Sequence, residues 1–225
     1  MSLPSGLKIN SRLLFRRLSE QKLILKNMQK ISSLLDFIDF LKENYDLNKE
    51  EENLIQKCFE IQEIKKNEIL LNIGEKCNKL HFVAQGLLRT FHLNKNGSEF
   101  TRLIVPEGKF CTILISFQEK ISSPAIIQAL ENGLVFSITL ENFQKFISQS
   151  PNAKNVYTKI LEDYQNFQIS RLEFLTTLSP QEKVEQFLAE NIDLEKRISD
   201  KIIATYLQIT PETYSRCKKK INEQS

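Results

Sequence analysis

The sequence lacks several features that would announce a function. Its 225 residues contain no apolar run approaching the roughly 18 to 20 residues that a membrane-spanning helix requires. The only histidines, His81 and His92, do not form the His-x-His cluster of a cupin-type metal enzyme. The four cysteines are scattered, with no pair at the CxxC spacing of a zinc ribbon or thioredoxin motif. We therefore expect a cytoplasmic, non-enzymatic protein with free thiols, no bound metal and no membrane contact.

The overall charge is also small, but its distribution along the chain is uneven. The formal net charge is +3, and the 41% hydrophobic and 26% charged fractions are typical of a globular protein. Residues 1–30 carry seven basic side chains and one acidic side chain, which indicates a basic N-terminal arm. Arg216 and Lys218 to Lys220 form a second basic group, as a phosphate-backbone contact requires. A solvated terminal helix would show the same pattern.

Residues 31–150 have the pattern of a β-rich domain that begins with two helices. Apolar side chains recur at helical spacing over 31–45 and 48–59. Turn residues such as Asn96-Gly97 then separate short runs of β-branched and aromatic residues, which predicts a sandwich, jelly roll or barrel. The predicted strands are 68–73, 79–84, 87–93, 99–105, 125–130 and 134–139. Residues 111–123 do not fit this pattern and are expected to form a short inserted helix and loop.

Residues 151–178 are predicted to form one long helix. Apolar and aromatic side chains recur along it at alternating steps of four and three, which is typical of a helix that pairs with a second helix. We therefore interpret it as a dimerisation helix. The predicted interface residues are Tyr157, Ile160, Tyr164, Phe167, Arg171 and Phe174. The alternative is that this seam packs on the protein's own barrel, and one helix can do both.

Residues 179–225 have the pattern of a helix-turn-helix domain. Ser199 can cap a short apolar helix, and Thr210 can cap a second helix with Pro211 in its first turn. On that second helix Glu212 and Arg216 stand four residues apart and share a face. Arginine can bind guanine through two hydrogen bonds, and glutamate can accept one from cytosine. The alternative is an exposed ion pair, which contributes only a few tenths of a kcal/mol.

The order of these segments, and residues Ile203–Arg216 above all, resembles the Crp/Fnr family of transcription regulators. The spacing of Gly74, Gly86, Gly97 and Gly108 adds to the resemblance, which covers roughly residues 45–221. It implies an α+β chain with an N-terminal cyclic-nucleotide-binding-like jelly roll or β-roll over 31–150. A dimerisation helix over 151–178 and a helix-turn-helix domain over 179–225 complete the implied fold.

Four positions depart from the family pattern, and one of them is Gln208, at a turn position that is often glycine. Ile113 stands where the cyclic-nucleotide-binding members carry the glutamate that holds the ribose, and Ser123 stands where they carry the arginine that holds the phosphate. We therefore expect that cyclic AMP does not bind and that no cofactor is present. Any other effector would contact Cys111, Thr112, Ile113, Leu114, Ser122 and Ser123. Pro211 replaces a basic residue, and the family's β-hairpin wing is expected to be missing after residue 225.

The resemblance implies a homodimer that binds palindromic double-stranded DNA, with RNA polymerase as a further expected partner. Glu212 and Arg216 would contact base edges. The DNA backbone would be contacted by Thr210, Thr213, Ser215, Lys218 and Lys219. An effector-binding or scaffold protein with a decayed DNA-binding helix is the alternative.

Overall fold

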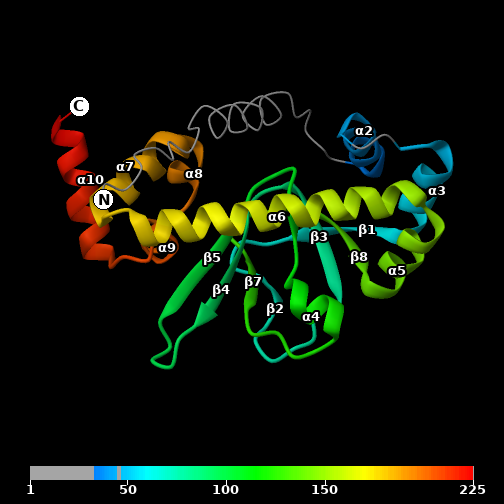
Figure 1. Cartoon of the computed structure of the whole chain (residues 1–225), viewed down its shortest axis with the longest axis horizontal. Coiled ribbons are helices and arrows are strands. Elements are labelled where there is room, and N and C mark those ends of the chain that lie inside the picture. Colours follow the sequence, from blue (N-terminus) through cyan, green and yellow to red (C-terminus); the bar gives the residue numbers. More distant parts are fainter. Residues whose placement is uncertain (1–32, 45–46, 225) are drawn as a thin grey trace, which may run out of the picture.

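The computed structural model describes residues 33–44 and 47–224. The basic arm predicted for residues 1–30 lies outside these residues. The described chain is α+β, as predicted: helices precede a β-barrel-like domain, a long helix crosses it, and four helices follow at one end (Figure 1).

The first two helices pack against one face of the barrel. Helix α2 (Leu34–Asn44) places Phe37 in ring contact with Phe82 and Phe136, with centroids 4.7 and 4.6 Å away. Helix α3 (Lys49–Cys58) begins with a capping box, in which Asn48 accepts from the Glu51 amide and the Glu51 carboxylate accepts from the Asn48 amide. The acidic first turn of α3 also complements the helix dipole.

Eight strands of the described chain form two four-stranded sheets, with orders β1-β8-β3-β6 and β2-β7-β4-β5. All the strand pairs are antiparallel. Apolar side chains such as Leu88, Ile127 and Val135, all fully buried, fill the space between the sheets. The strands are β1 (Phe59–Ile64), β2 (Ile69–Leu71), β3 (Lys79–Gln85), β4 (Leu88–Leu93), β5 (Glu99–Val105), β6 (Phe110–Cys111), β7 (Ile126–Ala129) and β8 (Gly133–Thr139).

The inserted helix predicted within residues 111–123 is α4 (Leu114–Glu119). After β8, helix α5 (Leu140–Gln149) leads into α6 (Pro151–Thr177), which crosses the barrel in Figure 1. Ser150 caps α6, and its hydroxyl donates to the buried Glu51 carboxylate, which also accepts from Asn152 at 3.2 Å. Glu51 therefore fixes the start of α6 against α3.

Four helices complete the C-terminal helical domain, residues 180–224, which lies beyond one end of the barrel (Figure 1). They are α7 (Pro180–Glu190), α8 (Ile192–Arg197), α9 (Asp200–Leu207) and α10 (Pro211–Gln224). Ser179, Ser199 and Thr210 accept from the third residue after each of them, as predicted from their positions. The α9–α10 pair is the expected helix-turn-helix.

The turn between α9 and α10 contains a left-handed residue that is not glycine. Gln208 has φ 56° and ψ 43°, a conformation that costs an L-residue roughly 1 kcal/mol or more. We expect Gln208→Gly to raise the free energy of unfolding, measured in urea, by about 0.5–1 kcal/mol. Gln208→Ala is the matched control because it keeps the strained Cβ. Equal stability of the two variants would contradict this explanation.

Candidate nucleic-acid interface

Helix α10 has one buried face and one exposed face. Tyr214 and Cys217 are buried in the core of the C-terminal helical domain, where they pack with Ile203 and Leu207 of α9. These contacts fix the rotation of α10 about its axis. The opposite face therefore points to solvent, with Glu212, Ser215, Arg216 and Lys219 exposed along it.

The two predicted base-contacting residues are exposed on this face. Glu212 and Arg216 form no ion pair with one another in the described chain, which is the contact that the alternative required. Hydrogen bonds from the Glu212 amide and from Thr210 lower the pKa of the Glu212 carboxyl, so it is ionised at neutral pH. An ionised glutamate beside an arginine can offer an acceptor and a bidentate donor to adjacent base edges.

The predicted backbone-contacting residues divide into two groups. Thr210, Thr213, Ser215 and Lys219 surround the exposed face, although the Thr210 hydroxyl also caps α10 by accepting from the Thr213 amide. Lys218 instead turns inward, and its ammonium group pairs with Glu195 at 2.7 Å and Asp200 at 3.1 Å. Hydrogen bonding to Glu195 is the main cause that raises its pKa above the ordinary value.

The position of Lys218 follows from helical spacing. Residues three, four, seven and eight positions after Glu212 share its side of the helix, whereas Lys218 is six positions after it. Lys220 is eight positions after Glu212 and is exposed, but the site prediction omitted it. Counting the helical repeat from Glu212 would have selected Lys220 in place of Lys218.

The predicted effector-pocket residues flank α4, and the hydroxyl groups of Thr112 and Ser123 are engaged within the chain. Thr112 donates to the Lys79 carbonyl at 3.1 Å, and Ser123 donates to the Ala125 carbonyl at 2.6 Å. Ile113 packs in the barrel core. Cys111 is buried, Leu114 begins α4, and Ser122 forms an isolated bridge with Lys76. None of the six side chains carries a charge.

The histidines have structural partners in the barrel. His81 in β3 is buried and hydrogen-bonds Ser137 at 2.8 Å through Nδ1. Burial lowers the pKa of His81 to about 4, which keeps the ring neutral at physiological pH. His92 in β4 contacts the Pro124 carbonyl at 2.9 Å. Both side chains therefore help to hold the strands.

Three of the six predicted dimer-interface residues in α6 contact their own chain. Tyr157 stacks edge-on with Phe143 of α5, with centroids 4.9 Å apart. The Arg171 guanidinium lies 3.8 Å from the ring of Tyr206 and donates to its carbonyl oxygen. Phe174 packs with the core of the C-terminal helical domain. These three side chains therefore face their own chain, as the alternative interpretation of the periodicity allows, and dimer formation through the seam stays a prediction.

A different side of α6 exposes apolar surface. Ile169 is 51% exposed and Leu172 is 63% exposed, and they lie three residues apart on one face. Beside Leu172 lies a hollow of about 320 Å³ that Phe100 of β5 and Leu175 of α6 also line. Large apolar side chains this exposed on a long helix indicate a contact surface.

Comparisons with known proteins agree with this architecture. The family model for the cyclic nucleotide-binding domain matches residues 61–150. A comparison with curated protein sequences finds no match. No helix within the described residues is both long and apolar enough to cross a membrane.

Several solved structures share the arrangement. A transcriptional regulator of the Crp/Fnr family from Eubacterium rectale is 23% identical, with a TM-score of 0.67 over 81% of this chain and 87% of that chain. The c-di-GMP responsive global regulator CLP from Xanthomonas campestris is 14% identical, with a TM-score of 0.66 over 79% of this chain and 93% of that one. FixK2 from Bradyrhizobium japonicum is 16% identical, with a TM-score of 0.64 over 74% of this chain and 85% of that chain.

Residues 61–150 therefore resemble a cyclic nucleotide-binding domain in sequence. The chain shares the fold of solved Crp/Fnr transcription regulators over 74–81% of its length, which confirms the resemblance and the α+β class.

Proposed function

We propose that the protein is a sequence-specific transcription regulator that binds palindromic DNA as a homodimer. The observation that carries this proposal is the exposed face of α10, where Glu212 and Arg216 lie opposite the buried Tyr214 and form no ion pair with one another in the described chain. Thr213, Ser215, Lys219 and Lys220 flank that pair. In a major groove the pair would contact base edges while the flanking residues contact phosphates. This function places the protein in the cytoplasm, with RNA polymerase as a further partner.

The proposed dimer forms through α6, by the face that bears Ile169 and Leu172. This face supplies exposed apolar surface, whereas the predicted seam is partly covered by the same chain. Leu161 and Gln165 precede Leu172 on the same side of the helix. A two-fold axis along α6 would present two copies of α10 to successive major grooves, about 34 Å apart.

We also propose that the barrel has no useful affinity for cyclic AMP. The position expected to hold the phosphate is the neutral, buried Ser123, whose hydroxyl already bonds Ala125, and Ile113 belongs to the apolar core. A phosphate buried without a positive partner carries a large desolvation cost. Isothermal titration calorimetry of cyclic AMP into the purified protein is expected to show no binding at micromolar concentrations. A micromolar or tighter dissociation constant would overturn this assignment.

The test of the function is selection of bound duplexes from a random DNA pool by the purified protein, with no ligand added. We expect enrichment of a palindrome whose half-sites are about one helical turn apart. If no sequence is enriched, a decayed DNA-binding helix on an effector-binding or scaffold protein becomes the better explanation. The enriched base opposite Pro211 would also show how the missing basic residue changes the half-site.

A further inference from the structure

An ionic cluster joins the C-terminal helical domain to the barrel. Arg197, at the end of α8, donates to both oxygens of Glu107, at 2.6 and 3.0 Å, and to both oxygens of Glu131, at 2.6 and 3.1 Å. Glu107 lies in the turn before β6, and Glu131 lies in the turn between β7 and β8. Glu107 also accepts from the Gly86 amide at 2.9 Å, so the cluster is anchored to a third barrel turn.

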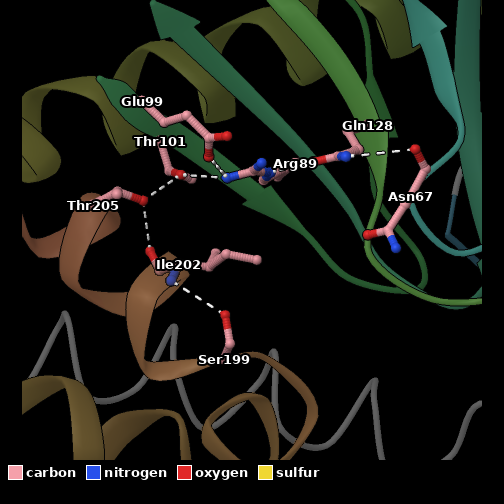
Figure 2. A network of polar contacts seen from close by, with 8 residues as sticks. All are labelled: Asn67, Arg89, Glu99, Thr101, Gln128, Ser199, Ile202 and Thr205. Carbon is pink, nitrogen blue, oxygen red and sulfur yellow. Dashed lines mark hydrogen bonds and ion pairs between the residues drawn. The ribbon is translucent and has the colours of Figure 1, made fainter. Parts of the chain in front are cut away.

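A second contact lies at β5 (Figure 2). The Thr101 hydroxyl is 2.7 Å from the Thr205 hydroxyl of α9. The buried Arg89 side chain supports Thr101 from within the sheet, where it also pairs with Glu99 at 2.7 Å and bonds Gln128 at 2.8 Å. The two contacts hold different helices, α8 and α9, so together they restrict rotation of the domain on the barrel.

Apolar packing closes the space between these polar contacts. The core of the C-terminal helical domain includes three side chains from the barrel, namely Leu87, Ile104 and Leu130. Arg171 of α6 also stacks on Tyr206 of α9. The domain that carries α10 is therefore fixed both to the barrel and to the proposed dimer helix.

We propose that Arg197 is a positioning residue that sets the spacing between the two DNA half-sites. This inference rests on the proposed function. Arg197 touches no base in that arrangement, but it fixes α10 relative to α6 by holding α8 to two barrel turns. A domain held in this way accepts one separation of half-sites. Release of the cluster leaves the α10 surface intact and lets each domain pivot, so the range of accepted spacings widens.

The experiment uses the palindrome selected by the full-length protein, with the spacer shortened or lengthened by one and two base pairs. Each added pair turns one half-site by roughly 34–36° and moves it by about 3.4 Å. Dissociation constants are measured for the wild type, Arg197→Met, and the exposed neighbour Lys196→Met as the matched control. A second route to the same release, Glu107→Gln with Glu131→Gln, leaves α8 unchanged.

We expect the wild type and Lys196→Met to lose about tenfold in affinity or more on each altered spacer, as a mismatched site does. Arg197→Met and the double glutamine variant should lose about threefold or less, with unchanged preference for the bases within each half-site. Thermal unfolding confirms that each variant is folded.

Two results would overturn the inference, and they are distinguishable. Retention of the narrow spacing preference by both folded release variants would show that Arg197 has no positioning role, although the DNA-binding function would stand. Absence of any selected palindrome for the wild type would refute the proposed function, and this inference with it.

Discussion

Ile169→Glu combined with Leu172→Glu is expected to convert the proposed homodimer to a monomer and to weaken binding to the proposed palindrome by about 100-fold or more. The loss has two causes. The substitutions place four carboxylates at an interface of two chains, where burial removes their hydration without providing a positive partner. A monomer also binds each half-site independently and loses the high effective concentration that a linked second domain provides.

Light scattering measures the molar mass of the protein in solution. Comparison of the affinity for the full palindrome with that for a single half-site measures how much the second domain adds to binding. Ser170→Glu is the matched control, since it adds a carboxylate at an exposed position of α6 that is neither three nor four residues from Ile169 or Leu172. The control should remain a dimer. If the protein with the Ile169 and Leu172 substitutions is still a dimer, the proposed interface is wrong, and the predicted seam with Ile160 and Phe167 becomes the better candidate.

Arg216→Ala is expected to cost about 1–3 kcal/mol at one base pair of each half-site and to remove the preference for one base there. The side chain is exposed on α10 and forms no ion pair with Glu212 in the described structure, so its loss leaves the fold and the glutamate unaffected. Binding is measured against a panel of duplexes with each base at that position.

Lys219→Ala is the matched control on the same face. Loss of a phosphate contact weakens binding to every duplex alike and lowers the salt dependence by about one ion. If Arg216→Ala behaves in the same uniform way, Arg216 contacts a phosphate and not a base.

The sequence predicts best those elements whose ends carry capping chemistry. Ser179, Ser199 and Thr210 correctly marked the beginnings of α7, α9 and α10, because a helix end requires a side chain to satisfy free backbone amides. Strand β1 was missed because α3 ends at Cys58 and the strand begins at Phe59, with no glycine or proline between them. The change from helix to strand is imposed by pairing with β8, which is distant in sequence, so the local residues do not indicate it.

Periodicity also has a physical limit at the candidate site. It correctly showed that one side of α6 is apolar, but it does not state which surface covers that side. Arg171 and Phe174 are covered by the C-terminal helical domain, a contact between segments distant in sequence. Lys218 is a similar case, because its charge matched the expected DNA contact while Glu195 and Asp200 hold it inward.

The barrel and the C-terminal helical domain share one hydrophobic core, in which Leu87, Ile104 and Leu130 pack against α7, α9 and α10. Cutting the chain after α6 would expose these apolar side chains to water on both fragments. Each aliphatic side chain that loses its burial would lower the stability of its fragment by about 1.5–3 kcal/mol. The C-terminal helical domain is therefore not expected to fold independently of the barrel. The protein should unfold as one cooperative unit, and a change in barrel stability would be transmitted to DNA affinity without any ligand.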